Sequence, residues 1–310
     1  MNPIRVENEY GQLKTVILGV APSLYFPGTH DIESEDESAW WKKVITRLVY
    51  PLFSGRAVPR FLVRKYQREL EGLRDALTSR GVQVLRLDEV RVQLEEPPGL
   101  GQMYARDSVL CVNETMIAAN LQIDMRNKEM RGYRSILNKM SAAGAKIETI
   151  SPSSDIYLEG GDVIVDLPYV YVGIGKYASN MKGAQWLQHR LGSGIMVVPI
   201  RLANDGILHL DCCMTLIGEK QGIIHRESLQ SPLPYPLNTY DFIEVDQKTR
   251  AEMGTNILMV GPKQIIVQKR HISLQQQLKE RDFEVIPLDF TWHARLDGAF
   301  RCATCPIYRV

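Results

Sequence analysis

The sequence predicts an α/β fold in which about five similar units pack side by side as a ring within one domain. The first observation is a recurring order of elements: strand, turn, strand, helix, strand. The second is the composition of the 310 residues, of which 45% are hydrophobic and 24% charged, enough to bury a sizeable core. A unit this small cannot bury its apolar faces alone, so its copies are expected to pack against one another and close. A generic α/β sheet with alternating elements is the alternative.

The chain opens with a candidate strand at 14–20, followed by a long segment at about 21–59. That segment contains proline, glycine and an acidic cluster, which favour a loop. We interpret it as an insertion, either decoration or a lid, with a short helix near 40–49. Trp40 and Trp41 within it either cap a cavity or form a contact in a homodimer.

The units follow from about residue 60. Amphipathic helices are each followed by a polar or glycine break and a short apolar strand. The helix and strand pairs are 62–79 with 80–87, 128–142 with 143–150, 180–191 with 194–200, and 273–279 with 281–288. Pairs of short strands precede three of these helices, at 108–112 with 116–119, 163–166 with 170–172, and 257–260 with 264–267. Another pair, 209–217 with 222–225, has no obvious helix after it.

Charge and hydropathy exclude several partners. The formal net charge is +1, so no overall field favours nucleic acid or an anionic membrane. No apolar run is long enough to span a bilayer, and Arg5, Glu7 and Glu9 stand where a signal peptide needs an apolar core. We therefore expect a cytoplasmic protein without a nucleic-acid or membrane partner.

The five cysteines are an odd number, and Cys212 adjoins Cys213, which is a poor disulfide framework. Cys302 and Cys305 have C-x-x-C spacing, which suits a zinc site, a redox pair or a nucleophile. Zinc is disfavoured because no second close pair of ligands is present, and a redox pair because no helix follows. A reactive cysteine is the remaining interpretation.

Polar residues interrupt the apolar pattern at equivalent places in several units. They are Arg106 and Asp107, Glu159 and Asp162 flanking two glycines, and His209 and Asp211. Each motif alone is more often a surface pair, a turn or a buried core histidine. Because equivalent positions of a ring face its axis, we expect these side chains to converge on one central cavity with Cys302.

These motifs resemble the guanidino-group-modifying enzymes, the superfamily of arginine deiminase, dimethylarginine dimethylaminohydrolase and amidinotransferase. The resemblance rests on Arg106-Asp107, Glu159-Gly-Gly-Asp162, His209-Leu-Asp211 and Asp297-Gly-Ala-Phe-Arg-Cys302, and it runs from Glu9 to the C-terminus outside 21–59. It implies a five-bladed α/β propeller, the pentein fold, with pseudo-fivefold symmetry around a central active-site cavity. It also implies one domain over 1–310.

The resemblance implies a role for each site residue. Asp107 and Asp211 would clamp the planar cationic guanidinium of a small-molecule substrate, which two carboxylates can bind bidentately. Cys302 would attack as a thiolate and carry a covalent thiouronium intermediate. His209 would act as general acid and base, with Glu159 binding the guanidinium and polarising His209. No metal or organic cofactor is implied.

The motifs leave the reaction open between two enzymes. Glu159-Gly-Gly-Asp162 and His209-Leu-Asp211 resemble arginine deiminases and favour a hydrolase. The segments 113–117, 131–136 and 179–188 resemble amidinotransferases, although those usually have Asp in place of Glu159. The arginine that binds a substrate carboxylate in the hydrolases is missing from 173–180, where Lys176, or Arg226 in the next unit, could replace it. A non-catalytic binding propeller is the third possibility.

Overall fold

A computed structural model describes residues 3–22, 56–93, 95–96 and 100–310. In this structure the chain forms small mixed sheets. Most of the predicted insertion at 21–59, including 40–49, lies outside these residues. The described part contains five three-stranded sheets. Their strands are β3 (Val109–Val112), β4 (Thr115–Ala118) and β5 (Lys146–Thr149); β6 (Val163–Asp166), β7 (Tyr169–Ile174) and β8 (Met196–Arg201); β9 (Met214–Gly218), β10 (Gln221–Ile224) and β11 (Asp241–Glu244); β12 (Leu258–Gly261), β13 (Gln264–Gln268) and β14 (Glu284–Leu288); and β15 (Thr304–Arg309), β1 (Leu13–Leu18) and β2 (Gln83–Arg86).

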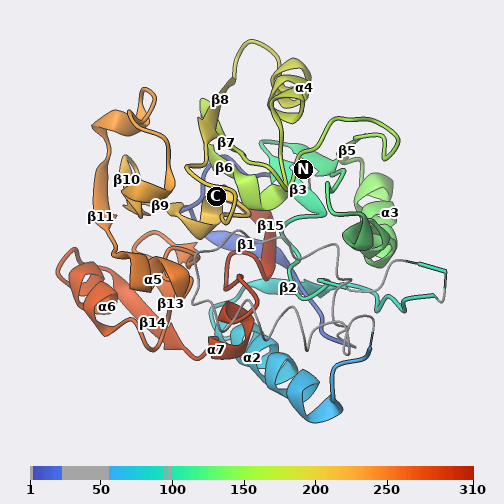
Figure 1. The fold of residues 1–310 in the computed structure, drawn as a ribbon, viewed down its shortest axis with the longest axis horizontal. Coiled ribbons are helices and arrows are strands. Elements are labelled where there is room, and N and C mark those ends of the chain that lie inside the picture. Colours follow the sequence, from blue (N-terminus) through green and yellow to red (C-terminus); the bar gives the residue numbers. More distant parts are fainter. Residues whose placement is uncertain (1–2, 23–55, 94, 97–99) are drawn as a thin grey trace.

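All five sheets have the same internal pattern. The first two strands are antiparallel and the second and third are parallel, as in β6, β7 and β8. In the fifth sheet β15 is antiparallel to β1 and β1 is parallel to β2, so the two ends of the chain share one sheet. Figure 1 shows the sheets arranged around the middle of the molecule. The structure confirms the α/β class and the repeated unit.

Four helices join the second strand of a unit to the third. They are α2 (Arg60–Thr78), α3 (Arg134–Ala142), α4 (Met181–Leu191) and α6 (Ile272–Lys279), and they lie at the outside of the molecule (Figure 1). The α2 helix buries Val63, Leu70 and Leu77 on one face, at the spacing expected of an amphipathic helix. Asn180 caps α4 by accepting a 2.9 Å hydrogen bond from the Gly183 N–H.

One connection differs from the prediction, and another agrees with it. The helix predicted at 128–142 begins as a 3-10 segment, η2 (Asp124–Tyr133), and becomes α-helical only at Arg134. Between β10 and β11 the described structure has only two short 3-10 turns, η5 (Arg226–Ser228) and η6 (Leu237–Thr239). Pro232, Pro234 and Pro236 explain the missing helix, because proline lacks an N–H and clashes with the preceding turn.

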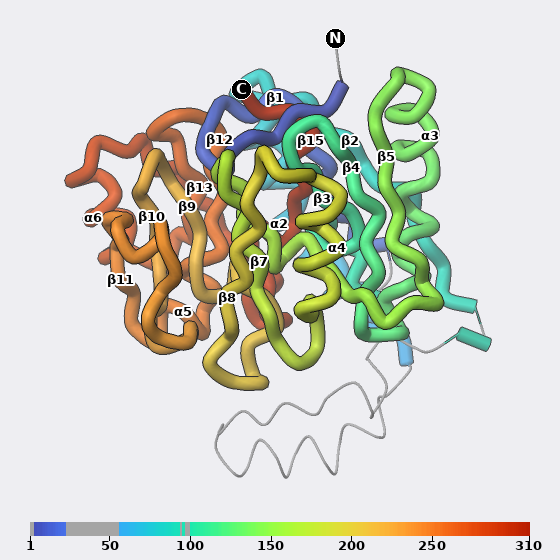
Figure 2. The backbone as a smooth tube through the Cα atoms, turned by 90° about the horizontal axis from the view of Figure 1, so that it is seen from above, coloured from blue at the N-terminus to red at the C-terminus, as the bar shows by residue number. Residues whose placement is uncertain are grey.

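Four of the strands are buried on both faces. Every residue of β3, β4, β6 and β12 is buried, because helices or neighbouring sheets cover both sides. Seen from above, α3 and β5 lie at one side of the molecule and α6 and β11 at the other (Figure 2). Two short helices, α5 (Gln247–Ala251) and α7 (Thr291–Ala294), lie in other connections. Within the described ranges, none of the helices combines the length and apolar character needed to cross a membrane.

Candidate active site

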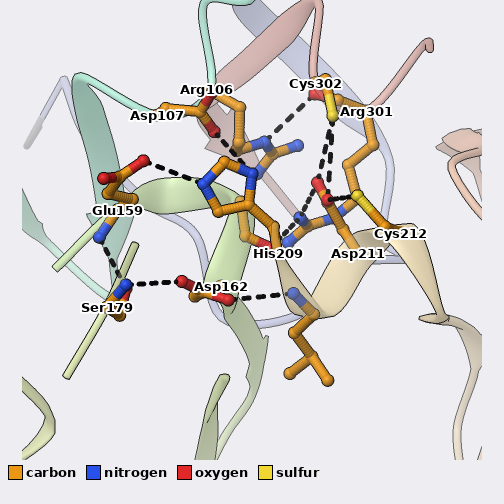
Figure 3. A network of polar contacts seen from close by, with 12 residues as sticks. Arg106, Asp107, Glu159, Asp162, Ser179, His209, Asp211, Cys212, Arg301 and Cys302 are labelled. Atoms are coloured by element: carbon orange, nitrogen blue, oxygen red, sulfur yellow. Dashed lines mark hydrogen bonds and ion pairs between the residues drawn. The ribbon is translucent and has the colours of Figure 1, made fainter. Parts of the chain in front are cut away.

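The site is built from the segments that lead into the first strands of four sheets. Asp107 precedes β3, Glu159 precedes β6, and Cys302 precedes β15. His209 and Asp211 precede β9, whose first residue is Met214; the strand predicted at 209–217 therefore starts later, and His209 to Asp211 approach it through the 3-10 turn η4 (Leu210–Cys212). Figure 3 shows these five side chains close to one another.

His209 and Glu159 form a buried pair at the centre of the site. Their side chains are 2% and 1% exposed, and His209 Nε2 lies 2.9 Å from Glu159 Oε2. The other Glu159 oxygen accepts a 3.0 Å hydrogen bond from the Gln122 N–H. The Glu159 N–H donates to Ser179 Oγ at 2.8 Å. Both the carboxylate and the backbone of Glu159 are thus fixed before any substrate binds.

His209 is protonated at neutral pH. Burial by itself lowers the pKa of an imidazole, but the carboxylates of Asp107, Glu159 and Asp162 raise the pKa of His209 to about 10. Burial raises the pKa of Asp162 to about 7. Its two oxygens accept hydrogen bonds from the N–H groups of Leu210, at 2.9 Å, and Ser179, at 3.0 Å. Asp162 therefore holds the segment that carries His209.

The two glycines between Glu159 and Asp162 are required by close packing. A Cβ on Gly160 would lie 1.9 Å from the Arg106 carbonyl oxygen, and a Cβ on Gly161 would lie 2.7 Å from His209 Cγ and 2.8 Å from Asp107 Oδ1. Only glycine leaves room for these neighbours. The Gly-Gly pair is what allows this segment to approach Asp107 and His209.

Asp107 is held by a buried arginine through one of its oxygens. Arg126 Nη1 lies 2.9 Å from Asp107 Oδ2, and Arg126 Nη2 lies 3.0 Å from Glu129 Oε2. Burial alone would raise the pKa of Asp107, but the charges of His209 and Arg126 lower it. Asp107 Oδ1 is buried and has no hydrogen-bond partner among the described residues, lying 3.9 Å from His209 Nδ1. This oxygen is available to a ligand.

Asp211 is held in a similar way. Arg301 Nη1 lies 2.8 Å from Asp211 Oδ2, and Arg301 Nη2 lies 3.0 Å from Glu9 Oε1. Arg301 also donates to the Val163 carbonyl oxygen at 2.6 Å. Burial by itself lowers the pKa of a guanidinium, but Glu9 and Asp211 raise the pKa of Arg301. Each of the two aspartates therefore has an ionic partner at Oδ2 that fixes its orientation.

The thiol of Cys302 lies beside Asp211. Its Sγ is 3.7 Å from both carboxylate oxygens of Asp211 and 3.0 Å from Asn256 Nδ2, and the residue is 3% exposed. Burial raises the pKa of the Cys302 thiol well above its usual range, and the charges of Asp211 and Asp107 add to this effect. Without a ligand the thiol is therefore neutral, and a bound cation would favour the thiolate.

Five of the six site residues predicted from the sequence are brought together: Cys302, His209, Glu159, Asp107 and Asp211 (Figure 3). Arg226 is elsewhere: its side chain is 47% exposed, and its Nε lies 2.8 Å from Glu244 Oε1. Lys176 is also exposed, with its Nζ 3.1 Å from Asp205 Oδ2. Within the described ranges, no group of three or more His, Cys, Asp or Glu side chains is arranged to hold a metal ion.

Sequence reasoning missed Asn256, Arg126 and Arg301. Asn256 stands two residues before β12, the place in its unit that Asp107 and Cys302 hold in theirs. That position was a signal that could have identified it. Nothing in the local sequence around Arg126 or Arg301 indicates which carboxylate each one binds.

Several known proteins resemble this chain in sequence. Residues 63–309 match the model of a family described as N,N dimethylarginine dimethylhydrolase, eukaryotic. The chain is 26% identical to a putative inosamine-phosphate amidinotransferase 2 of Streptomyces griseus, over 100% of this chain and 97% of that protein.

Two solved structures share the fold. One is SxtG, an amidinotransferase from Microseira wollei in the saxitoxin biosynthetic pathway, with a TM-score of 0.82 and 20% identity over 99% of this chain and 97% of that one. The other is a mutant DDAH from Pseudomonas aeruginosa complexed with citrulline, with a TM-score of 0.66 and 15% identity over 95% of this chain and 99% of that one.

Proposed function

Because the chain belongs to the N,N dimethylarginine dimethylhydrolase family of guanidino-group-modifying enzymes, we propose that it hydrolyses a guanidino compound through a covalent intermediate on Cys302. One observation carries the proposal. A buried thiol lies 3.7 Å from the carboxylate of Asp211, in the same cluster as Asp107 and a protonated imidazole bound to Glu159. A planar cation, a nucleophile and a proton donor can meet in such a site.

The substrate guanidinium binds to the carboxylate oxygens that the internal arginines leave free. Asp107 Oδ1 has no hydrogen-bond partner in the described structure, although it is buried and lies 3.9 Å from His209 Nδ1. A buried carboxylate oxygen without a donor is costly, and a guanidinium N–H would satisfy it. Arg301 binds Asp211 Oδ2, and Asp211 Oδ1 lies 3.7 Å from the sulfur, so N–H groups bound to Oδ1 would place the guanidinium carbon near Cys302.

The bound cation then activates the nucleophile. A positive charge beside the sulfur offsets Asp211 and Asp107, so the thiol loses its proton to solvent. The thiolate attacks the guanidinium carbon. The imidazolium of His209 gives its proton to the leaving nitrogen, and ammonia or an amine departs. An S-alkylthiouronium group remains on Cys302, and His209 is left neutral.

Water completes the reaction. Neutral His209 takes one proton from the water as its oxygen attacks the thiouronium carbon, and the second proton returns to the departing sulfur. The products are a ureido compound, the free thiol and protonated His209, so the starting state is restored. Glu159 stays bonded to the imidazole and stabilises its charged form in both steps.

The test is incubation with arginine, agmatine and methylated arginines while ureido product is followed. Intact-mass spectrometry during turnover should detect an adduct on the protein, absent in Cys302→Ala. That variant should lose the activity and retain the unfolding temperature of the parent. Absence of ureido product from every compound of this panel would contradict hydrolysis.

Amidino transfer is the second candidate, favoured by the relative that spans the whole chain and is named as an amidinotransferase. It shares the attack of Cys302 and differs only in the acceptor, an amine in place of water. Incubation with arginine should then yield ornithine and a new guanidino compound only when an amine acceptor is added. Ornithine formation that does not depend on the amine acceptor would contradict amidino transfer.

We also propose that the five sheets are the blades of a five-bladed propeller with pseudo-fivefold symmetry. The shared strand order supports this arrangement, as does the common position of Asp107, Asn256 and Cys302 two residues before a first strand. An experimental structure with five sheets related by rotations of about one fifth of a turn would establish it.

A further inference from the structure

We propose that Asn256 is a further catalytic residue, whose side-chain amide donates a hydrogen bond to the Cys302 sulfur and stabilises it as a thiolate. The inference rests on the proposed function in one respect, that Cys302 is the nucleophile. Asn256 comes from the β12 unit, the one unit in which the sequence analysis placed no site residue. It is fully buried at 0% exposure, so its amide groups need protein or ligand partners.

The orientation of the Asn256 amide follows from its backbone neighbours. Its Oδ1 lies 3.1 Å from the backbone nitrogen of Ala299 and 3.1 Å from that of Cys302. Both nitrogens carry a hydrogen and can only donate, so the atom that faces them must be the carbonyl oxygen. The group that faces the sulfur is therefore the NH₂, and Asn256 Nδ2 lies 3.0 Å from Cys302 Sγ.

The acidic groups around the sulfur oppose the thiolate. Asp211 and Asp107 carry negative charge. Cys212 and Tyr104 also interact with Cys302 and become negative if they ionise. Asn256 Nδ2 approaches the sulfur more closely than either Asp211 oxygen does, at 3.0 Å against 3.7 Å. Two hydrogen bonds lower the pKa of the Cys302 thiol against these groups, one from the backbone at Ala299 and one from the side chain of Asn256. Asn256 supplies the side-chain donor.

The hydrogen bond acts in both halves of the reaction. Hydrogen bonds to a charged partner are stronger than those between neutral groups. The bond from Asn256 therefore strengthens when Cys302 becomes a thiolate before attack, and again when the sulfur departs from the thiouronium carbon. Because the donor is held by two backbone bonds, it needs no reorganisation at either moment.

Two substitutions separate the donor from the turn that Asn256 also stabilises. Asn256→Asp keeps an oxygen for the Ala299 and Cys302 N–H groups but removes the N–H that faces the sulfur. Asn256→Ala removes both. Thr255→Val is the matched control, because Thr255 Oγ1 shares with Asn256 Nδ2 a 3.4 Å contact to the Asp211 carbonyl oxygen without being bonded to the sulfur.

The readout is alkylation of Cys302 by iodoacetamide from pH 6 to 11, located by peptide mass mapping. This measurement requires no guanidino substrate and no turnover, so a failure of the proposed function would not obscure it. A rise of about one pKa unit lowers the thiolate fraction about tenfold, partly offset by greater nucleophilicity, so the rate at pH 8 should fall about three- to tenfold. We expect Asn256→Asp to be at least as slow as Asn256→Ala, and Thr255→Val to stay within about twofold of the parent.

The proposal would be overturned if Cys302 in Asn256→Asp were alkylated at the parent rate. The role of Asn256 would then be only to stabilise the turn. Should Asn256→Asp not fold, the pH profile of Asn256→Ala decides. Loss of a thiolate donor raises the pKa of the Cys302 thiol, so the deficit in alkylation rate narrows at the alkaline end of the range, as the thiol begins to ionise in both proteins. A displaced turn gives the same deficit at every pH, and that result would also overturn the proposal.

Discussion

The two aspartates that face the thiol are both fixed by a buried arginine, but the two arginines are connected to the rest of the molecule differently. Arg126 lies on η2 and binds Asp107 and Glu129, which is three residues away in the same unit. Arg301 binds Asp211, Glu9 near the N-terminus and the first carbonyl of β6. Arg126 orients Asp107 within its own unit. Arg301 orients Asp211 and also connects three units.

Because of this difference, we expect loss of Arg126 to affect mainly the site and loss of Arg301 to affect the stability of the whole molecule. Breaking a buried ion pair leaves an unpaired charge behind, and its cost depends on whether the surroundings can relax. Glu129 and Asp107 belong to one unit. Glu9, Asp211 and Val163 are held together only by the tertiary structure, so loss of Arg301 affects several units at once.

The largest effect is therefore expected from Arg301→Met. It leaves Glu9 and Asp211 buried without their partner, and the free energy of unfolding should fall by about 3–5 kcal/mol. Urea unfolding followed by circular dichroism measures the loss. The comparison would be wrong if Arg126→Met destabilised the protein by as much or more.

Arg126→Met should cost less, about 1–3 kcal/mol, but should reduce activity strongly because Asp107 is no longer oriented. Without Arg126 the pKa values of Asp107 and Glu129 rise. Lowering the pH then protonates both buried carboxylates, and the stability deficit relative to the parent should shrink. A deficit that stays constant between pH 8 and pH 5 would contradict this explanation.

A third prediction concerns the charge of His209. Its pKa of about 10 in the folded protein exceeds the usual 6.5, so the resulting stability is complete below pH 6.5 and is lost as the pH rises to 10. Asp107→Asn removes the largest contribution that raises this pKa, so the loss should end at a lower pH. The pH-dependent part of the free energy of unfolding should change by on the order of 1–2 kcal/mol in this variant.

Asp211→Asn is the matched control, because Asp211 is not among the main groups that raise the pKa of His209. NMR titration of the His209 ring in both variants measures the shift directly. Equal pKa values in the two variants would mean that the two aspartates are electrostatically equivalent toward His209.

The smallest effect is expected from Arg226→Ala. Its exposed ion pair with Glu244 contributes little, so stability should change by less than about 0.5 kcal/mol. If Arg226 bound a substrate carboxylate, as the sequence suggested, the KM for arginine would rise and the KM for agmatine would not. Because Arg226 is exposed, we expect the KM to stay unchanged for both arginine and agmatine.

Much of the fold could be predicted because its signals are local. Helix and strand periodicity located the repeated unit, and the three hairpins of β3–β4, β9–β10 and β12–β13 each have a residue with positive φ in the turn: Asn113, Lys220 and Lys263. The missing helix after β10 also has a local cause, the three prolines between 231 and 237. Such features depend on residues close together in the chain.

The sequence by itself determined which residue types meet in the candidate site: a thiol, an imidazole and several carboxylates, each placed just before a strand. Only the tertiary structure decided their partners. It paired β15 with β1, aimed the Asn256 amide at Cys302, and assigned Arg301 to Asp211 and Glu9. The reason is that periodicity arises from neighbouring residues. Pairing of buried polar groups depends on which distant segments packing brings within hydrogen-bond reach.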